Sequence, residues 1–220
     1  MIKCNVTING TISRKAQMRT DNDNNQFVSF SVSVVLPIKS GNRRAIEVSV
    51  SVPGTQNDCH KYQPQQRIEM QGSLNLRKRG NALYFNFTPD SVNLSPVETI
   101  DKIEGELEFR GTLGNKDIVV QTDKKGKPYI LFSGFSTEKV GEGFEYMWVR
   151  FIRFTGECEA FLQPKAKVHV KGALEVSLYK DRIDIGCRVT DIAEWVREPY
   201  HQSGEAPSFV PQRPEDECPM

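Results

Sequence analysis

The segment Q-P-Q-Q-R-I-E-M-Q-G-S-L, from Gln63 to Leu74, returns 100 residues later as Q-P-K-A-K-V-H-V-K-G-A-L, from Gln163 to Leu174. Three further blocks repeat at offsets of 101, 102 and 101. They are I-N-G-T-I from Ile8 with F-R-G-T-L from Phe109, F-V-S-F-S from Phe27 with Y-I-L-F-S from Tyr129, and I-E-V-S-V from Ile46 with M-W-V-R-F from Met147. A unit of this length is too long for a solenoid repeat, so the pattern predicts two copies of one domain.

The join between the copies falls in S-P-V-E-T-I-D-K, from Ser95 to Lys102. We therefore expect a first domain over residues 1–96, a second over residues 103–196 and a flexible tail over residues 197–220. The tail has five prolines in 24 residues and is too poor in apolar residues to form a core of its own.

Apolar and polar residues alternate within each copy. One example is the series Val28, Phe30, Val32 and Val34, whose members are separated by single serines. This period of two predicts strands with one buried and one exposed face. About five strands per copy, with little helix, predict two small closed barrels of the OB type. The one helical feature that we expect is a turn or two over Glu157–Leu162.

The composition excludes several classes of protein. Hydrophobic residues make up 38% of the chain and charged residues 26%, which is typical of a globular protein. No apolar run approaches ~18 residues, and the N-terminus lacks a secretory h-region, so the expected location is cytoplasmic and not in a membrane. Five scattered cysteines and three histidines have no metal-ligand spacing, and no phosphate-binding loop is present, so we expect no metal, no cofactor and no enzymatic activity.

The net charge of +1 conceals a gradient along the chain: residues 1–100 carry +5, residues 101–196 carry −1 and residues 197–220 carry −3. A basic first half is consistent with a polyanionic partner, although it is equally consistent with ordinary solvation.

Single strands are bound by aromatic side chains that stack on bases and by cations that neutralise phosphates. The strand pattern predicts outward-facing residues of both kinds. In the second copy these are Tyr129, Trp148, Arg150, Lys167, His169, Lys171 and Tyr179. In the first copy they are Phe27 and Tyr84 on strands, and Arg43, Arg44, Arg77, Lys78 and Arg79 in hairpins. The alternatives are that Trp148 packs at a subunit or domain interface, and that the basic hairpins are merely solvated.

The order of these motifs resembles the bacterial single-stranded DNA-binding protein (SSB) family. M-W-V-R-F-I-R-F, from Met147 to Phe154, is similar to that family's third strand, whose Trp and Arg face the DNA. The last six residues, E-D-E-C-P-M, are similar to its acidic tip. Two departures are that Glu47 occupies the position matching Trp148, and that the chain ends in Met rather than the usual Phe.

The resemblance implies tandem OB folds that bind and protect single-stranded DNA without sequence preference, near the nucleoid. It implies that the tip recruits replication, repair, recombination or conjugation proteins through Glu215, Asp216, Glu217, Pro219 and Met220. Because the family works with four barrels, it also implies a homodimer. Two alternatives remain open: an OB-fold module for protein assembly, and a binder of RNA or oligosaccharide.

Overall fold

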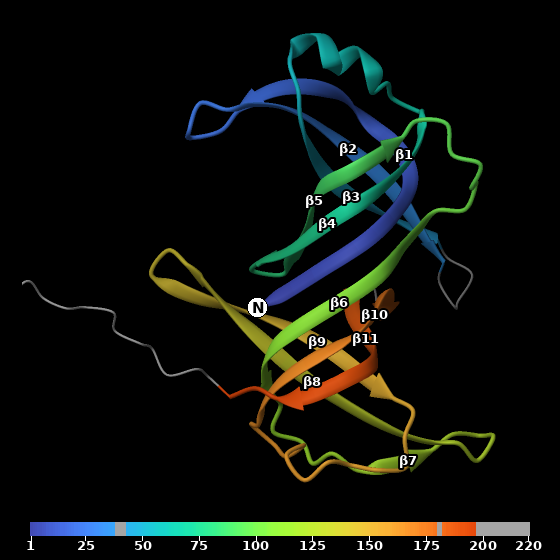
Figure 1. The fold of residues 1–220 in the computed structure, drawn as a ribbon, viewed down its shortest axis with the longest axis vertical. Coiled ribbons are helices and arrows are strands. Elements are labelled where there is room, and N and C mark those ends of the chain that lie inside the picture. Colours follow the sequence, from blue (N-terminus) through green and yellow to red (C-terminus); the bar gives the residue numbers. More distant parts are fainter. Residues whose placement is uncertain (38–42, 180–181, 197–220) are drawn as a thin grey trace, which may run out of the picture.

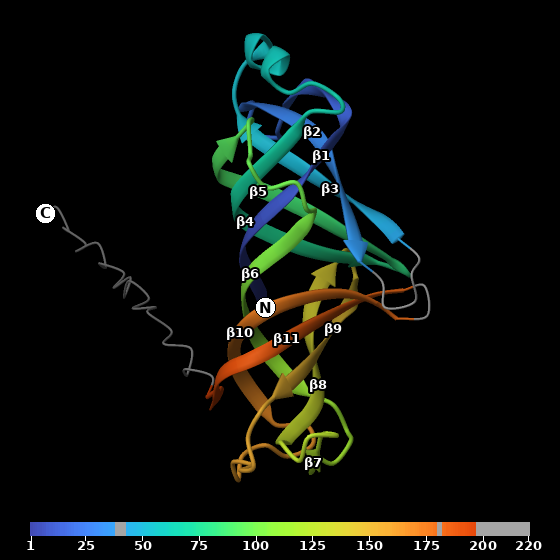
Figure 2. The ribbon, with the colours of Figure 1, turned by 90° about the vertical axis from the view of Figure 1, so that its right-hand side faces the viewer.

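The computed structural model describes residues 1–37, 43–179 and 182–196, and most of this part of the chain is β-strand (Figures 1 and 2). The first copy contains β1 (Ile2–Thr20), β2 (Gln26–Pro37), β3 (Arg43–Pro53), β4 (Arg67–Arg79), β5 (Ala82–Asn93) and a 3-10 helix (Gln56–Lys61). The second copy contains β6 (Lys102–Leu113), β7 (Val120–Thr122), β8 (Pro128–Val140), β9 (Gly143–Arg153), β10 (Lys167–Tyr179) and β11 (Arg182–Glu194).

The strand pairing closes each copy into a ring of five strands. In the first copy β1 pairs with β2 and β4, β2 pairs with β3, β3 runs parallel to β5, and β5 pairs with β4. The second copy repeats this pattern with β6, β8, β9, β11 and β10, while the short β7 lies beside β8. The predicted all-β fold of two OB-type barrels is therefore confirmed.

The apolar residues of the alternating pattern fill the two barrels. Val32 and Val48 of the first barrel have no exposed surface, and neither do Phe109 and Phe151 of the second. Phe109 and Phe151 meet edge to face, with ring centroids 4.9 Å apart. Because closure removes the sheet edges and buries one face of every strand, the period of two in the sequence is sufficient to specify this core.

The two barrels join through an antiparallel pairing of β1 with β6, which makes one continuous sheet in the order β4-β1-β6-β10. The pairing begins with Ile2 opposite Phe109 and includes Ile8 opposite Ile103. These two pairs exchange places when each residue is replaced by its equivalent in the other copy. The barrels are therefore related by an approximate two-fold axis through the centre of the β1–β6 pairing, with one barrel above the other in Figure 1.

Polar contacts outside the sheet secure this arrangement. Asp101 lies in the link between the barrels. Its carboxylate accepts a hydrogen bond from the Val35 backbone N–H (2.8 Å) and forms an ion pair with Arg67. At the other end of the β1–β6 pairing, the Met1 ammonium group donates to the Arg110 carbonyl oxygen (2.6 Å) and to the Ser136 hydroxyl. The first barrel thus holds the linker, and the second barrel holds the N-terminus.

The repeated glycines of the Q-P segments lie at matching β-bulges. The register of β4 with β5 shifts between Gln71 and Gly72, and that of β10 with β11 shifts between Lys171 and Gly172. A Cβ atom on Gly72 would lie 2.4 Å from a backbone oxygen, and one on Gly172 would lie 2.1 Å from another. Only glycine allows the strands to approach so closely, which explains why the sequence repeats it.

The expectation of helical turns over Glu157–Leu162 is wrong: these residues form no helix, and the 3-10 helix lies at the equivalent place in the first copy. There the Asp58 carboxylate accepts hydrogen bonds from the backbone N–H (2.8 Å) and the hydroxyl (3.0 Å) of Thr55, which begins the helix. In the second copy Gly156 takes the place of Thr55, and the Glu159 carboxylate binds Arg153 instead. The N-terminal capping interaction is therefore lost.

Candidate nucleic-acid interface

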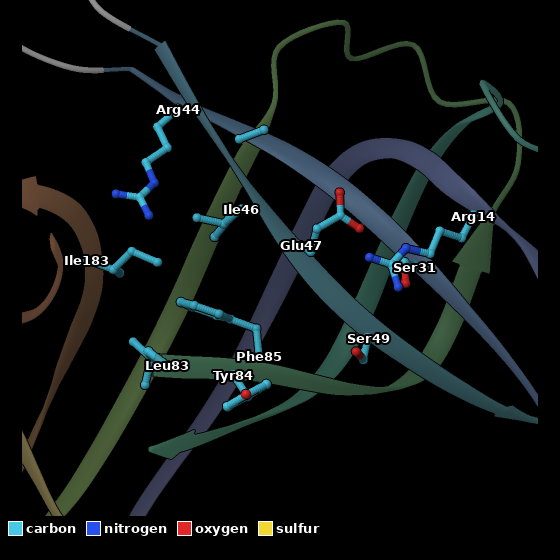
Figure 3. A pocket seen from close by; sticks show the side chains of 11 residues that line it. Arg14, Ser31, Arg44, Ile46, Glu47, Ser49, Leu83, Tyr84, Phe85 and Ile183 are labelled. Carbon is cyan, nitrogen blue, oxygen red and sulfur yellow. The ribbon is translucent and has the colours of Figure 1, made fainter. Parts of the chain in front are cut away.

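A groove runs between the two barrels. It consists of two cavities, of about 350 Å³ and about 800 Å³, which share the lining residues Arg44, Leu83 and Ile183. Because they share these residues, the cavities form one continuous depression. Figure 3 shows the smaller cavity, with the three shared residues at one end and Arg14 at the other.

The hairpin between β4 and β5 of the first barrel reaches across to the second barrel beside this groove. The Gly80 backbone N–H donates a hydrogen bond to the Glu145 carboxylate (3.2 Å), and the Lys78 ammonium group donates to the Tyr146 carbonyl oxygen (3.4 Å). Lys78, which the sequence predicted as a DNA contact, therefore also takes part in the contact between the barrels. Asn81 and Ala82 of the same hairpin line the larger cavity.

Two of the predicted aromatic residues, one from each barrel, line the groove. Tyr84 on β5 lines the smaller cavity and Trp148 on β9 lines the larger one, and each is 50% exposed. The Phe135 ring packs against Trp148, with centroids 5.1 Å apart and planes tilted by 52°, so that one side of the indole is supported. Arg77 lies directly opposite Tyr84 in the β4–β5 pairing. Two of the five aromatic residues predicted to face outward, Tyr84 and Trp148, therefore line the same depression.

At two pairs of equivalent positions, one barrel has an aromatic residue where the other has a carboxylate. Trp148 lies opposite Phe135, and its equivalent Glu47 lies opposite Ser33. Tyr84 lies opposite Arg77, and its equivalent Asp184 lies opposite Ser177. Each barrel thus offers one stacking surface and one acid.

Both of these acids are engaged by neighbouring groups. The Glu47 carboxylate accepts a hydrogen bond from the Ser13 hydroxyl (2.7 Å), and Asp184 forms an ion pair with Arg150 at 3.0 Å. Arg150, predicted as a phosphate contact, therefore has part of its charge compensated within the protein.

Basic side chains from both barrels surround the stacking residues. Arg14, Arg44, Lys78 and Arg182 line the two cavities, against Glu47 and Asp184 as their acidic residues. Arg77 and Arg79 are exposed on the β4–β5 hairpin. The groove is therefore positive overall, as a phosphate backbone requires.

Two of the predicted aromatic residues, Phe27 and Tyr129, do not join this groove. Phe27 lies opposite Pro53 on β3, six residues along β2 from Ser33, which faces Glu47. Tyr129 lies opposite Gln121 on β7, six residues along β8 from Phe135, which faces Trp148. That distance is about 20 Å on an extended strand. The Tyr129 hydroxyl donates to the Gln121 side-chain oxygen (2.9 Å).

Lys167 and Lys171 lie on β10, and β11 separates them from β9. Lys171 lines a different cavity of about 600 Å³ on the shared sheet, which has no lining residue in common with the groove. His169, between them, binds the Glu108 carboxylate at 2.8 Å. The predicted single face of aromatic and basic residues on the second barrel is therefore divided between two surfaces, because β10 and β9 are not neighbours in the ring.

Several predicted residues lie outside the described part of the structure. They are the side chains of Arg43 and Tyr179, and the tail residues Glu215, Asp216, Glu217, Pro219 and Met220. Three exposed aromatic or basic residues that line the groove, Arg14, Tyr146 and Arg182, are not among the site residues predicted above. The alternation F-E-Y-M-W before Trp148 was the signal for Tyr146, and Arg182 had no comparable signal.

Cys4 and Cys187 are buried, whereas Cys158 is exposed. No three His, Cys, Asp or Glu side chains among the described residues come together as a metal site. Burial raises the pKa of Cys4 to about 12, and burial together with nearby Cys4 and Glu175 raises the pKa of Cys187 to about 12. Both thiols therefore stay protonated near neutral pH. No helix in the described ranges is long and apolar enough to span a membrane.

The strand pairing defines this chain as a protein of two OB-type barrels. No family model and no curated protein matches its sequence. Among solved structures it is similar to the wild-type single-stranded DNA-binding protein from Thermus aquaticus, at 16% identity over 93% of this chain and 98% of that one, with a TM-score of 0.47.

Two further solved structures each match less than half of this chain. The Plasmodium falciparum SSB, in complex with ssDNA, has 14% identity over 43% of this chain and 95% of that one, with a TM-score of 0.31. The N-terminal domain of PriB from Thermoanaerobacter tencongensis has 16% identity over 42% of this chain and 97% of that one, with a TM-score of 0.29. The assignment to the OB class is based on strand pairing and not on these likenesses.

Proposed function

We propose that this chain binds single-stranded DNA without strong sequence preference, along the groove between its barrels. One observation carries the proposal: Tyr84 and Trp148, each half-exposed, line a single continuous depression that is rich in arginine and lysine. Aromatic rings stack on any base, and basic side chains neutralise phosphates of any sequence. Such a groove therefore distinguishes single-stranded from duplex DNA, but it distinguishes poorly between different sequences.

Fluorescence titration with oligo-dT tests this proposal directly. The chain has two tryptophans, Trp148 and Trp195, so a Trp195→Phe background leaves Trp148 as the sole tryptophan. Stacking of a base on Trp148 is expected to quench its emission. Duplex DNA, oligo-U and an oligosaccharide serve as competitors. Equal competition by duplex, or displacement by the oligosaccharide alone, would contradict the proposal, and stronger binding of oligo-U would make RNA the ligand.

We expect the affinity for oligo-dT to fall steeply with salt. The logarithm of the association constant should decline linearly with the logarithm of salt concentration, by ~0.7 per phosphate neutralised on a single strand. Replacing Arg77 and Arg79 together by Ala should reduce this slope. Lys78 is left in place because its ammonium group contacts the Tyr146 carbonyl oxygen. The matched control is Asp184→Asn, which releases Arg150 from its ion pair and should not reduce the slope.

We also propose that the tail recruits replication, repair, recombination or conjugation proteins, with the chain acting in the cytoplasm beside the nucleoid. What supports this is the run of Glu215, Asp216 and Glu217 ahead of the terminal Pro219 and Met220, in a segment of net charge −3. Chain termination after residue 210 should leave oligo-dT binding intact, or strengthen it slightly at low salt, because the acidic tail competes for the groove. It should abolish binding to purified proteins of these classes, and much weaker DNA binding would instead place the tail in the DNA site.

Finally, we propose that two chains associate as a homodimer, which would bring four barrels together. Ser29, Ser31 and Ser33, which alternate with buried residues along β2, offer a flat surface for such pairing. Ser31, however, lines the groove, so a dimer that persists with DNA bound must pair through another surface. Light scattering of the full and shortened chains, with and without oligo-dT, should give twice the mass of the respective chain for the protein, which is 24.9 kDa for the full chain. A monomer mass throughout would contradict the dimer.

A further inference from the structure

The tip of the β4–β5 hairpin combines three cations with a backbone donor. Arg77–Arg79 are all basic, and residues 74–89 contain no Asp or Glu. Gly80 follows them in the turn with a left-handed backbone, at a φ of 58°. Its N–H group lies outside the β4–β5 ladder, because Arg79 and Ala82 are the last paired residues. A backbone N–H group surrounded by cations is a typical site for an anion.

The carboxylate of Glu145, from the second barrel, occupies this position. The Gly80 N–H donates to it at 3.2 Å, and the Lys78 ammonium group donates to the carbonyl oxygen of the next residue, Tyr146, at 3.4 Å. Figure 1 shows the ribbon of β8 and β9 in yellow, beside the tip of the β4–β5 hairpin. The second barrel thus supplies an internal anion to a basic site on the first.

The ribbon that carries Glu145 does not itself favour an acid there. Glu138 lies directly opposite Glu145 in the β8–β9 register, and like charges in that arrangement destabilise a pair of strands. At the equivalent position of the first barrel, 101 residues earlier, the chain has Arg44. The hairpin equivalent to β4–β5 carries S-L-Y at residues 177–179 in place of the three cations. The acid and the basic hairpin therefore occur together, on one side of the two-fold axis.

The contact is weak enough for a ligand to replace it. Both hydrogen bonds are longer than the ~2.9–3.0 Å that is usual for N–H···O, and Arg77 and Arg79 are exposed beside them. A DNA phosphate carries one negative charge, as a carboxylate does, and offers acceptor oxygens to the same donors. Lys78 and Asn81 of this hairpin line the groove, so a strand bound there presents its phosphates to the tip at high effective concentration.

We propose that Glu145 is an internal competitor of DNA. In the free protein its carboxylate holds the tip of the β4–β5 hairpin against the β8–β9 ribbon, and a phosphate of the bound strand replaces it at the Gly80 N–H. Protein in which Glu145 holds the tip cannot accept a phosphate there, so the contact lowers the affinity for DNA. This inference rests on the proposed function, because a strand in the groove is what brings a phosphate to the hairpin.

The test compares oligo-dT binding by Glu145→Gln and by the parent chain at low salt. The amide keeps the size and an acceptor oxygen of Glu145 but loses its charge. The variant should bind about 2- to 5-fold more tightly, which is the range that an exposed ion pair can supply. Glu142→Gln is the matched control, because Glu142 is an exposed acid in the turn of the same ribbon. It removes the same charge but leaves the acceptor of the Gly80 N–H in place, so its affinity should stay near that of the parent.

Two further measurements separate competition from a general effect of charge. In a background of Arg77→Ala with Arg79→Ala, most of the phosphate site is absent, so adding Glu145→Gln should give a much smaller gain than it gives in the parent. In the 15N-labelled parent, the amide resonance of Gly80 should shift when oligo-dT is added, because its hydrogen-bond acceptor changes.

The outcomes distinguish this inference from the proposed function. If Glu145→Gln weakens oligo-dT binding or leaves it unchanged, Glu145 is a strut between the barrels, and the inference is wrong while the proposed function stands. An equal gain from Glu142→Gln, an undiminished gain without the two arginines, or a Gly80 resonance that oligo-dT does not shift would each overturn it as well. If the parent does not bind oligo-dT at all, the proposed function and this inference both fail.

Discussion

Replacement of both Tyr84 and Trp148 by Ala is expected to weaken oligo-dT binding by about 2–6 kcal/mol. Stacking contributes ~1–3 kcal/mol per base, and contributions from separate sites add when they share no partner. Tyr84 projects from β5 of one barrel and Trp148 from β9 of the other, and both line the groove. Each single variant should therefore lose about half of the total, measured by anisotropy of a labelled oligomer.

The controls for this experiment are Tyr84→Phe and Trp148→Phe, which keep a ring that stacks on a base. Both should bind nearly as tightly as the parent, and circular dichroism should show the same β content for all variants. The alternative role of Trp148, packing at a subunit interface, makes a different prediction. If Trp148→Ala changes the mass in light scattering but not the affinity for DNA, the stacking role is wrong.

Gly105→Ala is expected to lower the free energy of unfolding by about 1–3 kcal/mol, in the range of substitutions that overpack a core. Gly105 lies opposite Val6 near the centre of the β1–β6 pairing, where the two barrels join. A Cβ atom there would lie 2.2 Å from the Asn5 carbonyl oxygen and 2.6 Å from the Val6 Cα atom. Both are backbone atoms, so β1 and β6 must move apart to admit the methyl group.

Urea unfolding measures this loss, and Gly143→Ala is the matched control, because its nearest atom would be 3.8 Å away. We also expect Gly105→Ala to weaken oligo-dT binding, since the groove needs both barrels in place. Unchanged stability and unchanged DNA affinity would show that the barrels do not depend on this close approach.

Much of the fold could be predicted from the sequence because its determinants are local. The alternation of Val28, Phe30 and Val32 specifies which side of β2 is buried, and the structure places all three inside the barrel. Repeated Gly72 and Gly172 mark the two bulges. The helical turn was misplaced because it depends on a Thr55–Asp58 capping interaction, and the apolar pattern over Glu157–Leu162 carries no information about the cap.

The candidate site could be predicted only in part. The alternating pattern identified Tyr84 and Trp148 as outward-facing, and both are exposed. It grouped Lys171 with Trp148, because outward-facing residues in one copy were treated as one surface. A closed barrel faces outward in every direction, so residues on β10 and β9 share a barrel without sharing a groove.

The sequence by itself determined the duplication, the strand character of each copy and the inward or outward direction of its side chains. These follow from periodicity, which is a property of neighbouring residues. Only the tertiary structure decided that β1 pairs with β6, that the groove lies between the barrels, and that Tyr84 and Trp148 line it together. The physical reason is that these features depend on contacts between residues many tens of positions apart, and those contacts are set by how two closed barrels pack and not by the pattern within either one.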